Sequence, residues 1–180
     1  MLLAKVTKNF VFIKGHPHVL WRIIVNYFYM VILRKPRLRS LDIETNYECP
    51  CTCDHCYSEN YPKGSLLSIN EIKSTVRQAK DLGALQVNLI GGEPLVREDI
   101  FEIIKVCAEE KMIVSLCTSA VGLTKHKVKK LKNSGLSVLI MSLDSLDPQK
   151  HDKIRGIRGL FQTVLNSIEW ALEYNIVPLV

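Results

Sequence analysis

Segments with the pattern of strands and segments with the pattern of helices alternate along most of this 180-residue chain. Short apolar runs are separated by longer amphipathic stretches, beginning with the run from Leu38 to Glu44. Strict alternation of this kind is typical of parallel strands joined by right-handed helical crossovers. The sequence therefore predicts an α/β fold built on a parallel sheet. The predicted strands are 38–44, 84–90, 112–118, 136–142 and 176–180.

Local signals place the ends of the helices between these strands. Ser68 and Glu71 have the spacing of a capping box, which predicts that a helix begins there. Gly83 is suited to the left-handed position just after that helix, and Gly135 is suited to the same position after another. The predicted helices are 68–83, 97–111, 124–133 and 161–174.

Five predicted strands are fewer than a closed eight-stranded barrel uses, and such a barrel takes about 250 residues. The chain ends inside the fifth predicted strand, at Val180. We therefore expect residues 37–180 to form an α/β unit of parallel strands that is truncated within the fifth strand and incomplete at its C-terminus. A basic, apolar segment, residues 1–36, precedes this unit.

The N-terminal segment concentrates the positive charge of the chain. Residues 1–41 contain eight Lys and Arg residues and no Asp or Glu, whereas the whole chain has a net charge of +6. Its apolar stretch from Val19 to Leu33 is shorter than the roughly 20 residues that a membrane-spanning helix needs, and no signal-peptide cleavage site follows it. We expect an amphipathic helix that packs on the barrel bottom or on a partner chain, with an anionic membrane surface as the alternative. The almost neutral remainder disfavours nucleic acid as a partner.

Four of the six cysteines lie within eight residues, directly after the first predicted strand. Such crowding is typical of metal ligands rather than of a disulfide framework, and it indicates a reducing, cytoplasmic environment. Cys49, Cys53 and Cys56 have the spacing CxxxCxxC. Three thiolates from one loop can bind three irons of a 4Fe–4S cluster and leave the fourth iron open to a small molecule. Cys51 does not fit this spacing, and we expect that it is not a ligand.

A second motif, Gly-Gly-Glu-Pro at positions 91–94, directly follows the second predicted strand. In barrels of this kind the functional loops meet at the C-terminal ends of the strands, so the two motifs are expected to share one edge. Together, this motif and the cysteine loop with Tyr57 behind it resemble those of radical S-adenosylmethionine enzymes. The resemblance covers roughly residues 37–180. It implies that these residues form a partial (β/α) TIM-like barrel, truncated within the fifth strand.

The resemblance implies an iron–sulfur enzyme. Its reduced 4Fe–4S cluster would pass one electron to S-adenosylmethionine, releasing a 5'-deoxyadenosyl radical that abstracts hydrogen from a substrate. An external low-potential donor would supply the electron, and the substrate could be a small molecule, a peptide or a lipid. The residues that the resemblance places at S-adenosylmethionine are Gly91, Gly92, Glu93, Pro94, Ser142, Asp144, Arg155 and His55.

The implied roles follow the parts of the cofactor. The strand end at Glu93 would bind the ammonium, while Ser142 and Asp144 would lie near the ribose and the methionyl part. Arg155 would pair with the carboxylate through a forked contact, the alternative being a solvated surface position. His55 would stack near the adenine or act as a metal ligand.

Two departures and two rival interpretations stay open. Thr118-Ser119-Ala120 stands where many members of the family have Thr-Asn-Gly, so we expect that loop to run differently. The chain could be a catalytically inactive fragment that binds a cluster but lacks the last strands. It could also be a zinc-binding structural module that uses Cys51, Cys53 and Cys56 with either His55 or Cys49, although four ligands on one tight loop strain tetrahedral geometry.

Overall fold

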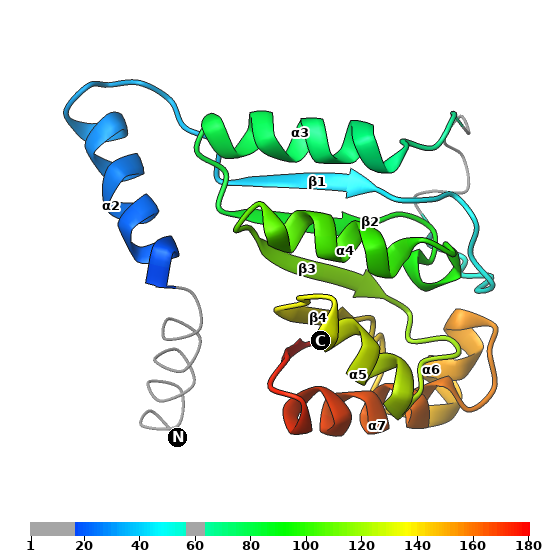
Figure 1. The fold of residues 1–180 in the computed structure, drawn as a ribbon. Helices are drawn as coiled ribbons and strands as arrows, with labels where there is room; N and C mark the ends of the chain where they lie inside the picture. Colours follow the sequence, from blue (N-terminus) through cyan, green and yellow to red (C-terminus); the bar gives the residue numbers. More distant parts are fainter. Residues whose placement is uncertain (1–16, 57–63) are drawn as a thin grey trace, which may run out of the picture.

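The computed structural model describes residues 17–56 and 64–180 of the chain. In this part, five parallel strands form one open sheet in the order β1-β2-β3-β4-β5 (Figure 1). All four neighbouring pairs are parallel, which confirms the predicted α/β class and its partial-barrel architecture. The strands are β1 (Ser40–Glu44), β2 (Gln86–Ile90), β3 (Ile113–Thr118), β4 (Val138–Met141) and β5 (Val177–Leu179).

Helices α3, α4, α5 and α7 lie in sequence along the sheet, each in contact with the next (Figure 1). The helical elements are α2 (Pro17–Val31), α3 (Ile69–Asp81), the 3-10 turn η1 (Pro94–Val96), α4 (Ile100–Glu109), α5 (Lys125–Asn133), α6 (Pro148–Arg155) and α7 (Leu160–Glu173). The pattern analysis missed α6. Its start carried two recognisable signals, because Asp147 caps the N–H of Lys150 and Pro148 occupies the first turn.

The predicted helix ends agree with the structure. Ser68 and Glu71 form a complete capping box, in which the Ser68 N–H donates to the Glu71 carboxylate at 2.8 Å. Gly83, just after α3, has a φ of +110°, and Gly135, just after α5, has a φ of +103°. Both therefore adopt the left-handed conformation that ends a helix at low steric cost.

The core lies between the sheet and these helices. Alternate strand residues point to opposite faces, and Leu89 of β2 and Leu116 of β3 are fully buried beneath the helices. The other face carries a polar row instead. There the Gln86 side-chain nitrogen donates to the Ser115 hydroxyl at 2.9 Å. The helix residues that complete the core include Ile72, Val76, Ile103, Ile104, Val128, Leu131 and Val164.

Helix α2 lies at the end of the sheet where the strands begin (Figure 1). Its Asn26 side-chain nitrogen donates to the Gly83 carbonyl oxygen at 2.7 Å, and Arg22 donates to the Lys111 carbonyl oxygen at 3.1 Å. The helix thus contacts the bottom of the partial barrel, one of the positions suggested by the sequence. None of the described helices combines the length and the apolar character that crossing a membrane requires.

Candidate functional site

The motifs identified in the sequence come together at the end of the sheet to which the strands point (Figure 1). The cysteine loop follows β1, the Gly-Gly-Glu-Pro turn follows β2, Thr118 ends β3 and Ser142 follows β4. The Ser142 N–H donates to the Thr118 carbonyl oxygen at 3.1 Å, which joins the last two of these strand ends. This placement is the one expected for a functional edge of parallel strands.

The turn after β2 is bonded directly to the residues before Cys49. The Gly92 N–H donates to the Asn46 carbonyl oxygen at 2.9 Å, and the Glu93 N–H donates to the Glu48 carbonyl oxygen at 2.7 Å. A Cβ atom on Gly92 would lie only 2.3 Å from the Glu48 carbonyl oxygen. Glycine is therefore needed here for the approach of two backbone segments of the protein itself. That Gly92 lies at S-adenosylmethionine stays a prediction.

Asn46 holds the base of the cysteine loop from within. Its buried side-chain nitrogen donates to the carbonyl oxygens of Glu93 at 3.0 Å and Glu48 at 3.1 Å. The sequence analysis did not identify this role. The available signal was a polar side chain three residues before Cys49 and two residues after a strand.

Arg97 supports the same loop from the other side, and it too was not identified from the sequence. Its guanidinium donates to the Thr45 carbonyl oxygen at 2.7 Å and to the Leu67 carbonyl oxygen at 2.8 Å. Asp99 holds the guanidinium in place through a contact of 2.6 Å from Arg97 Nε to Asp99 Oδ1. That hydrogen bond from Arg97 lowers the pKa of the Asp99 carboxyl below its ordinary value. The Arg97 side chain is only 9% exposed, so it has a structural role at the site.

The Glu93 side chain is fully buried and joins the ends of β2 and β3. Its Oε1 atom accepts from the Thr118 hydroxyl at 2.6 Å and from the Leu95 N–H at 3.2 Å. Its Oε2 atom accepts from the Ser119 N–H at 2.7 Å and also from the Ser119 hydroxyl. Four protein donors therefore surround the carboxylate. It brings negative charge to this edge, but its lone pairs are already used by the protein.

Ala120 shows how the loop after β3 accommodates the missing glycine. This fully buried residue has a φ of +70°, a left-handed conformation that glycine adopts at much lower cost. Its N–H donates to the Thr118 hydroxyl at 2.9 Å, which helps to hold the turn. The backbone thus adopts a glycine-like turn despite the alanine side chain.

Arg155, at the end of α6, connects the loop after β4 to the cysteine loop. Its Nε and Nη2 atoms donate to the two carboxylate oxygens of Asp144 at 2.6 and 2.9 Å, and its Nη1 atom lies 3.6 Å from Cys53 Sγ. The Thr52 N–H donates to the Arg155 carbonyl oxygen at 3.1 Å. The Arg155 side chain is 15% exposed, so it does not occupy a solvated surface position.

Charge at this contact is balanced locally. Desolvation opposes the charged form of Asp144, but the forked hydrogen bonds from Arg155 outweigh it and lower the pKa of the Asp144 carboxyl. Two histidines lie beside this pair. His55 Nε2 is 3.7 Å from Asp144 Oδ1, and its side chain is 57% exposed. His151 is fully buried, and its Nδ1 atom accepts from the Asp144 N–H at 3.3 Å. The pattern analysis missed His151 together with α6.

The four loop cysteines differ in environment. Cys49 is exposed, Cys51 and Cys56 are partly buried, and Cys53 is buried. Desolvation raises the pKa of the Cys53 thiol, and the neighbouring Arg155 guanidinium opposes that rise. Desolvation also raises the pKa of Cys51, against a hydrogen bond with Ser119. Tyr57, which completes the motif in the sequence, lies outside the described residues.

The sequence suggested two kinds of metal site for the loop cysteines. Within residues 17–56 and 64–180, no three Cys, His, Asp or Glu side chains converge on one point that could bind an ion. A structural zinc site requires four ligands around one centre. A 4Fe–4S cluster has its irons at separate corners, so its ligand thiolates lie further apart. Three thiols on one loop, with a guanidinium beside Cys53, suit such a group.

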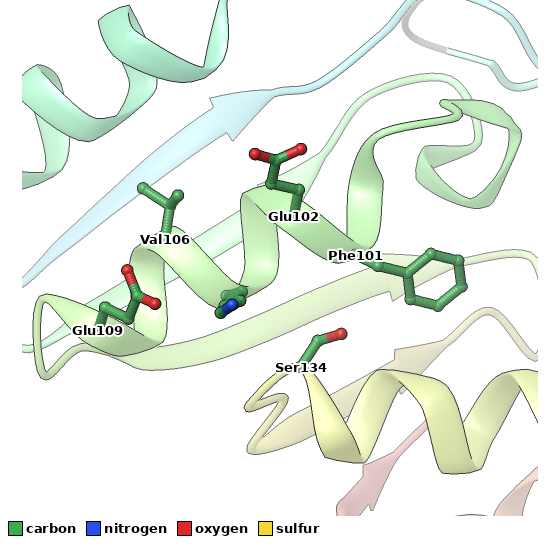
Figure 2. Close-up of a pocket in the computed structure, with 6 residues that line it drawn as sticks. Phe101, Glu102, Val106, Glu109 and Ser134 are labelled. Carbon is green, nitrogen blue, oxygen red and sulfur yellow. The ribbon is translucent and has the colours of Figure 1, made fainter.

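A separate hollow of about 400 Å³ lies beside α4 (Figure 2). Ser134, just after α5, lines it together with residues of α4. No motif of the strand ends contributes to this hollow. Its lining residues are Phe101, Glu102, Lys105, Val106, Glu109 and Ser134.

Comparison with known proteins agrees with this geometry. Residues 43–180 match the family model described as the Radical SAM superfamily. A probable GTP 3',8-cyclase from Methanococcus maripaludis strain C5 is 34% identical over 145 residues, covering 79% of this chain and 48% of that protein. The PqqA peptide cyclase from Bradyrhizobium diazoefficiens is 29% identical over 136 residues, covering 74% of this chain and 36% of that protein.

Solved structures show the same fold. Streptococcus suis SuiB bound to its precursor peptide SuiA superposes with a TM-score of 0.64 at 26% identity, covering 74% of this chain and 31% of that chain. Methylornithine synthase PylB superposes with a TM-score of 0.65 at 21% identity, covering 79% of this chain and 44% of that chain. The present chain thus spans about half or less of the length of these four proteins.

Proposed function

Because this chain belongs to the radical SAM superfamily, we propose that it binds a 4Fe–4S cluster and S-adenosylmethionine and initiates radical chemistry on a substrate. When both are bound, the cluster would supply one electron for breaking the bond between the sulfonium sulfur and C5' of S-adenosylmethionine. That cleavage would release methionine and leave a 5'-deoxyadenosyl radical for hydrogen abstraction. The observation that carries the proposal is the attachment of the cysteine loop to both the Gly-Gly-Glu-Pro turn and α6. Two independent supports hold the loop in one position at the strand ends.

The proposed cluster ligands are Cys49, Cys53 and Cys56. Cys53 is buried beside Arg155, whose positive charge favours the thiolate form that a metal ligand must take. Cys51 differs from these three because its thiol contacts the Ser119 side chain at the end of β3. We therefore retain Cys51 as a neighbour of the cluster rather than as a ligand.

S-adenosylmethionine would bind at the fourth iron, next to Arg155. Two nitrogens of this guanidinium are committed to Asp144, so Nη1 is the one directed toward the cysteine loop. A cofactor carboxylate in this place could accept from the same side of the guanidinium. His55 is exposed beside Asp144 and is free to stack on an adenine. Glu93 would act by positioning the strand ends, since its lone pairs are occupied.

The class of substrate is proposed from the relatives of this chain. The relatives named above are a probable GTP 3',8-cyclase and a PqqA peptide cyclase, and SuiB was solved with a precursor peptide. We accordingly keep a small molecule or a peptide as the substrate class. An external low-potential donor would deliver the electron.

The test is anaerobic reconstitution of the full-length protein with iron and sulfide, followed by dithionite and S-adenosylmethionine. Release of 5'-deoxyadenosine, measured by mass spectrometry, is the expected result. Cys51→Ala serves as the matched control for replacing a proposed ligand such as Cys53, since it removes a thiol from the same loop without removing a ligand. If the protein takes up about four irons per chain yet releases no 5'-deoxyadenosine, the catalytic proposal is wrong and cluster binding without catalysis replaces it.

A further inference from the structure

Helix α2 is oriented with its apolar side away from the protein. A continuous stripe of its large apolar side chains is at least 51% exposed. We call this stripe the apolar face of α2. It consists of Leu20, Trp21, Ile24, Tyr27, Phe28 and Val31.

Polar contacts on the opposite side of the helix fix this orientation. Asn26, only 8% exposed, donates to the Gly83 carbonyl oxygen at 2.7 Å, and Arg22 donates to the Lys111 carbonyl oxygen at 3.1 Å. Val19, also 8% exposed, packs in a small apolar cluster with strand residues of the sheet. Rotating the apolar face inward would break all of these contacts. The stripe is therefore a stable outer surface of the described fold.

The charge around this face has one sign. Residues 17–41 contain five Lys and Arg residues and no Asp or Glu. Arg34 and Lys35 lie three and four residues after the end of α2 and are exposed, and neither forms an ion pair within the described part of the chain. In the sequence, Lys5, Lys8 and Lys14 extend the same basic character. The complementary surface must accept apolar side chains and supply negative charge.

We propose that α2 docks the protein in the plane of a bilayer that contains anionic lipid. The apolar face would enter the boundary between headgroups and acyl chains, as in-plane amphipathic helices do. The rings of Trp21 and Tyr27 suit that boundary because one end of each is polar. Arg34 and Lys35 would contact the anionic headgroups.

This docking has a consequence for the catalytic edge. Helix α2 lies where the strands begin, and the cysteine loop lies where they end (Figure 1). The bilayer would therefore hold the protein from the side opposite the cluster loop. Docking of this kind anchors the enzyme and leaves its strand-end loops facing the aqueous phase.

A second copy of the chain is a poorer occupant of the same face. Pairing two copies through this face would bring together Arg34 and Lys35 of each chain, with no carboxylate from residues 17–41 of either copy. Like charges at close range oppose such pairing unless other anions intervene. An anionic bilayer supplies those charges and an apolar layer at once.

Co-sedimentation of the full-length protein with vesicles tests the proposal. The vesicles are phosphatidylcholine alone, or an equimolar mixture of phosphatidylcholine and phosphatidylglycerol. Wild type should sediment with the mixed vesicles, and Arg34→Glu with Lys35→Glu should weaken that binding at least about tenfold. Trp21→Glu with Tyr27→Glu should abolish it. Leu146→Glu is the matched control, because Leu146 is 84% exposed and lies in the loop before α6, and this variant should bind like wild type.

Three results would overturn the proposal. The first is wild-type protein that stays in the supernatant with both vesicle types. The second is a Trp21→Glu/Tyr27→Glu variant that sediments as wild type does while keeping the wild-type circular dichroism spectrum. The third is wild-type protein that does not bind vesicles and is a dimer by light scattering, while the Trp21→Glu/Tyr27→Glu variant is a monomer. The apolar face of α2 would then bind a second copy of the chain.

Discussion

Replacing Glu93 by glutamine should destabilise the fold of the strand ends by about 3 kcal/mol. The buried carboxylate accepts from two hydroxyls and two backbone N–H groups, those of Leu95 and Ser119. A glutamine amide has one acceptor oxygen and one NH₂ group. In either orientation, the NH₂ group faces one hydroxyl, which can rotate to accept, and one backbone N–H, which cannot.

The magnitude follows from that count. One buried N–H left without an acceptor costs about 1–3 kcal/mol, and the loss of charge assistance in the remaining bonds adds to it. Urea unfolding of the reduced apo-protein, followed by circular dichroism, measures the change in the free energy of unfolding. Glu98→Gln is the matched control, because Glu98 is exposed in the same loop and should change stability by less than about 0.5 kcal/mol.

The same variant separates two roles of Glu93. If the side chain positions the strand ends, Glu93→Gln should also weaken S-adenosylmethionine binding while the cluster absorbance remains. Equal stabilities of Glu93→Gln and wild type would refute the reasoning, because a saturated buried carboxylate cannot be replaced without loss. Weaker cofactor binding at unchanged stability would instead assign Glu93 to direct contact with the cofactor.

Three further outcomes are expected. Cys51→Ala should keep near-normal iron content and 5'-deoxyadenosine release, whereas Cys53→Ala should lose the cluster absorbance; equal loss in both would overturn the ligand assignment. The hydrogen bond from Arg77 lowers the pKa of the Glu110 carboxyl in the folded protein. The interaction therefore contributes about 1 kcal/mol to the free energy of unfolding above the pKa that Glu110 has in the unfolded chain, and this contribution is lost as the pH falls through the pKa of the folded state. Urea midpoints of wild type and Glu110→Gln should therefore converge on acidification, and a constant difference would contradict this. Burial raises the pKa of Cys107 to about 12, so iodoacetamide at pH 8 should modify it only after unfolding, as peptide mass spectrometry would show.

The order of the elements was predictable because each signal is local. Apolar runs of strand length and the capping box at Ser68 depend on neighbouring residues only, and the structure places these elements within a few residues of the prediction. The motifs at the strand ends were equally accessible, since parallel strands direct their C-terminal ends to one edge. Helix α6 was missed because its eight residues are mostly polar and carry little hydrophobic periodicity.

The contacts between strand ends could not be read from the sequence. Arg155 and Cys53 are 102 residues apart, and their contact requires both the helix α6 and the course of the cysteine loop. Likewise, the four donors to Glu93 come from two different strand ends, which only the sheet register brings together. The outward orientation of α2 depends on which side chains find carbonyl partners at the bottom of the sheet. Periodicity alone would have turned the apolar side inward.

The cysteine loop illustrates how such contacts create a site from an irregular segment. A loop lacks the regular backbone hydrogen bonds of a helix or a sheet, so its backbone polar groups must find partners elsewhere. Here the Gly92 and Glu93 N–H groups bond its first half to β2, and the Thr52 N–H bonds its second half to α6. One support is the turn after β2 and the other is α6, so neither half of the loop can move without breaking one of these contacts. The close contact between the turn after β2 and the cysteine loop explains why position 92 requires glycine, although this residue is not a proposed ligand of the cluster. The Glu48 carbonyl oxygen that a Cβ would meet at 2.3 Å belongs to the residue directly before Cys49.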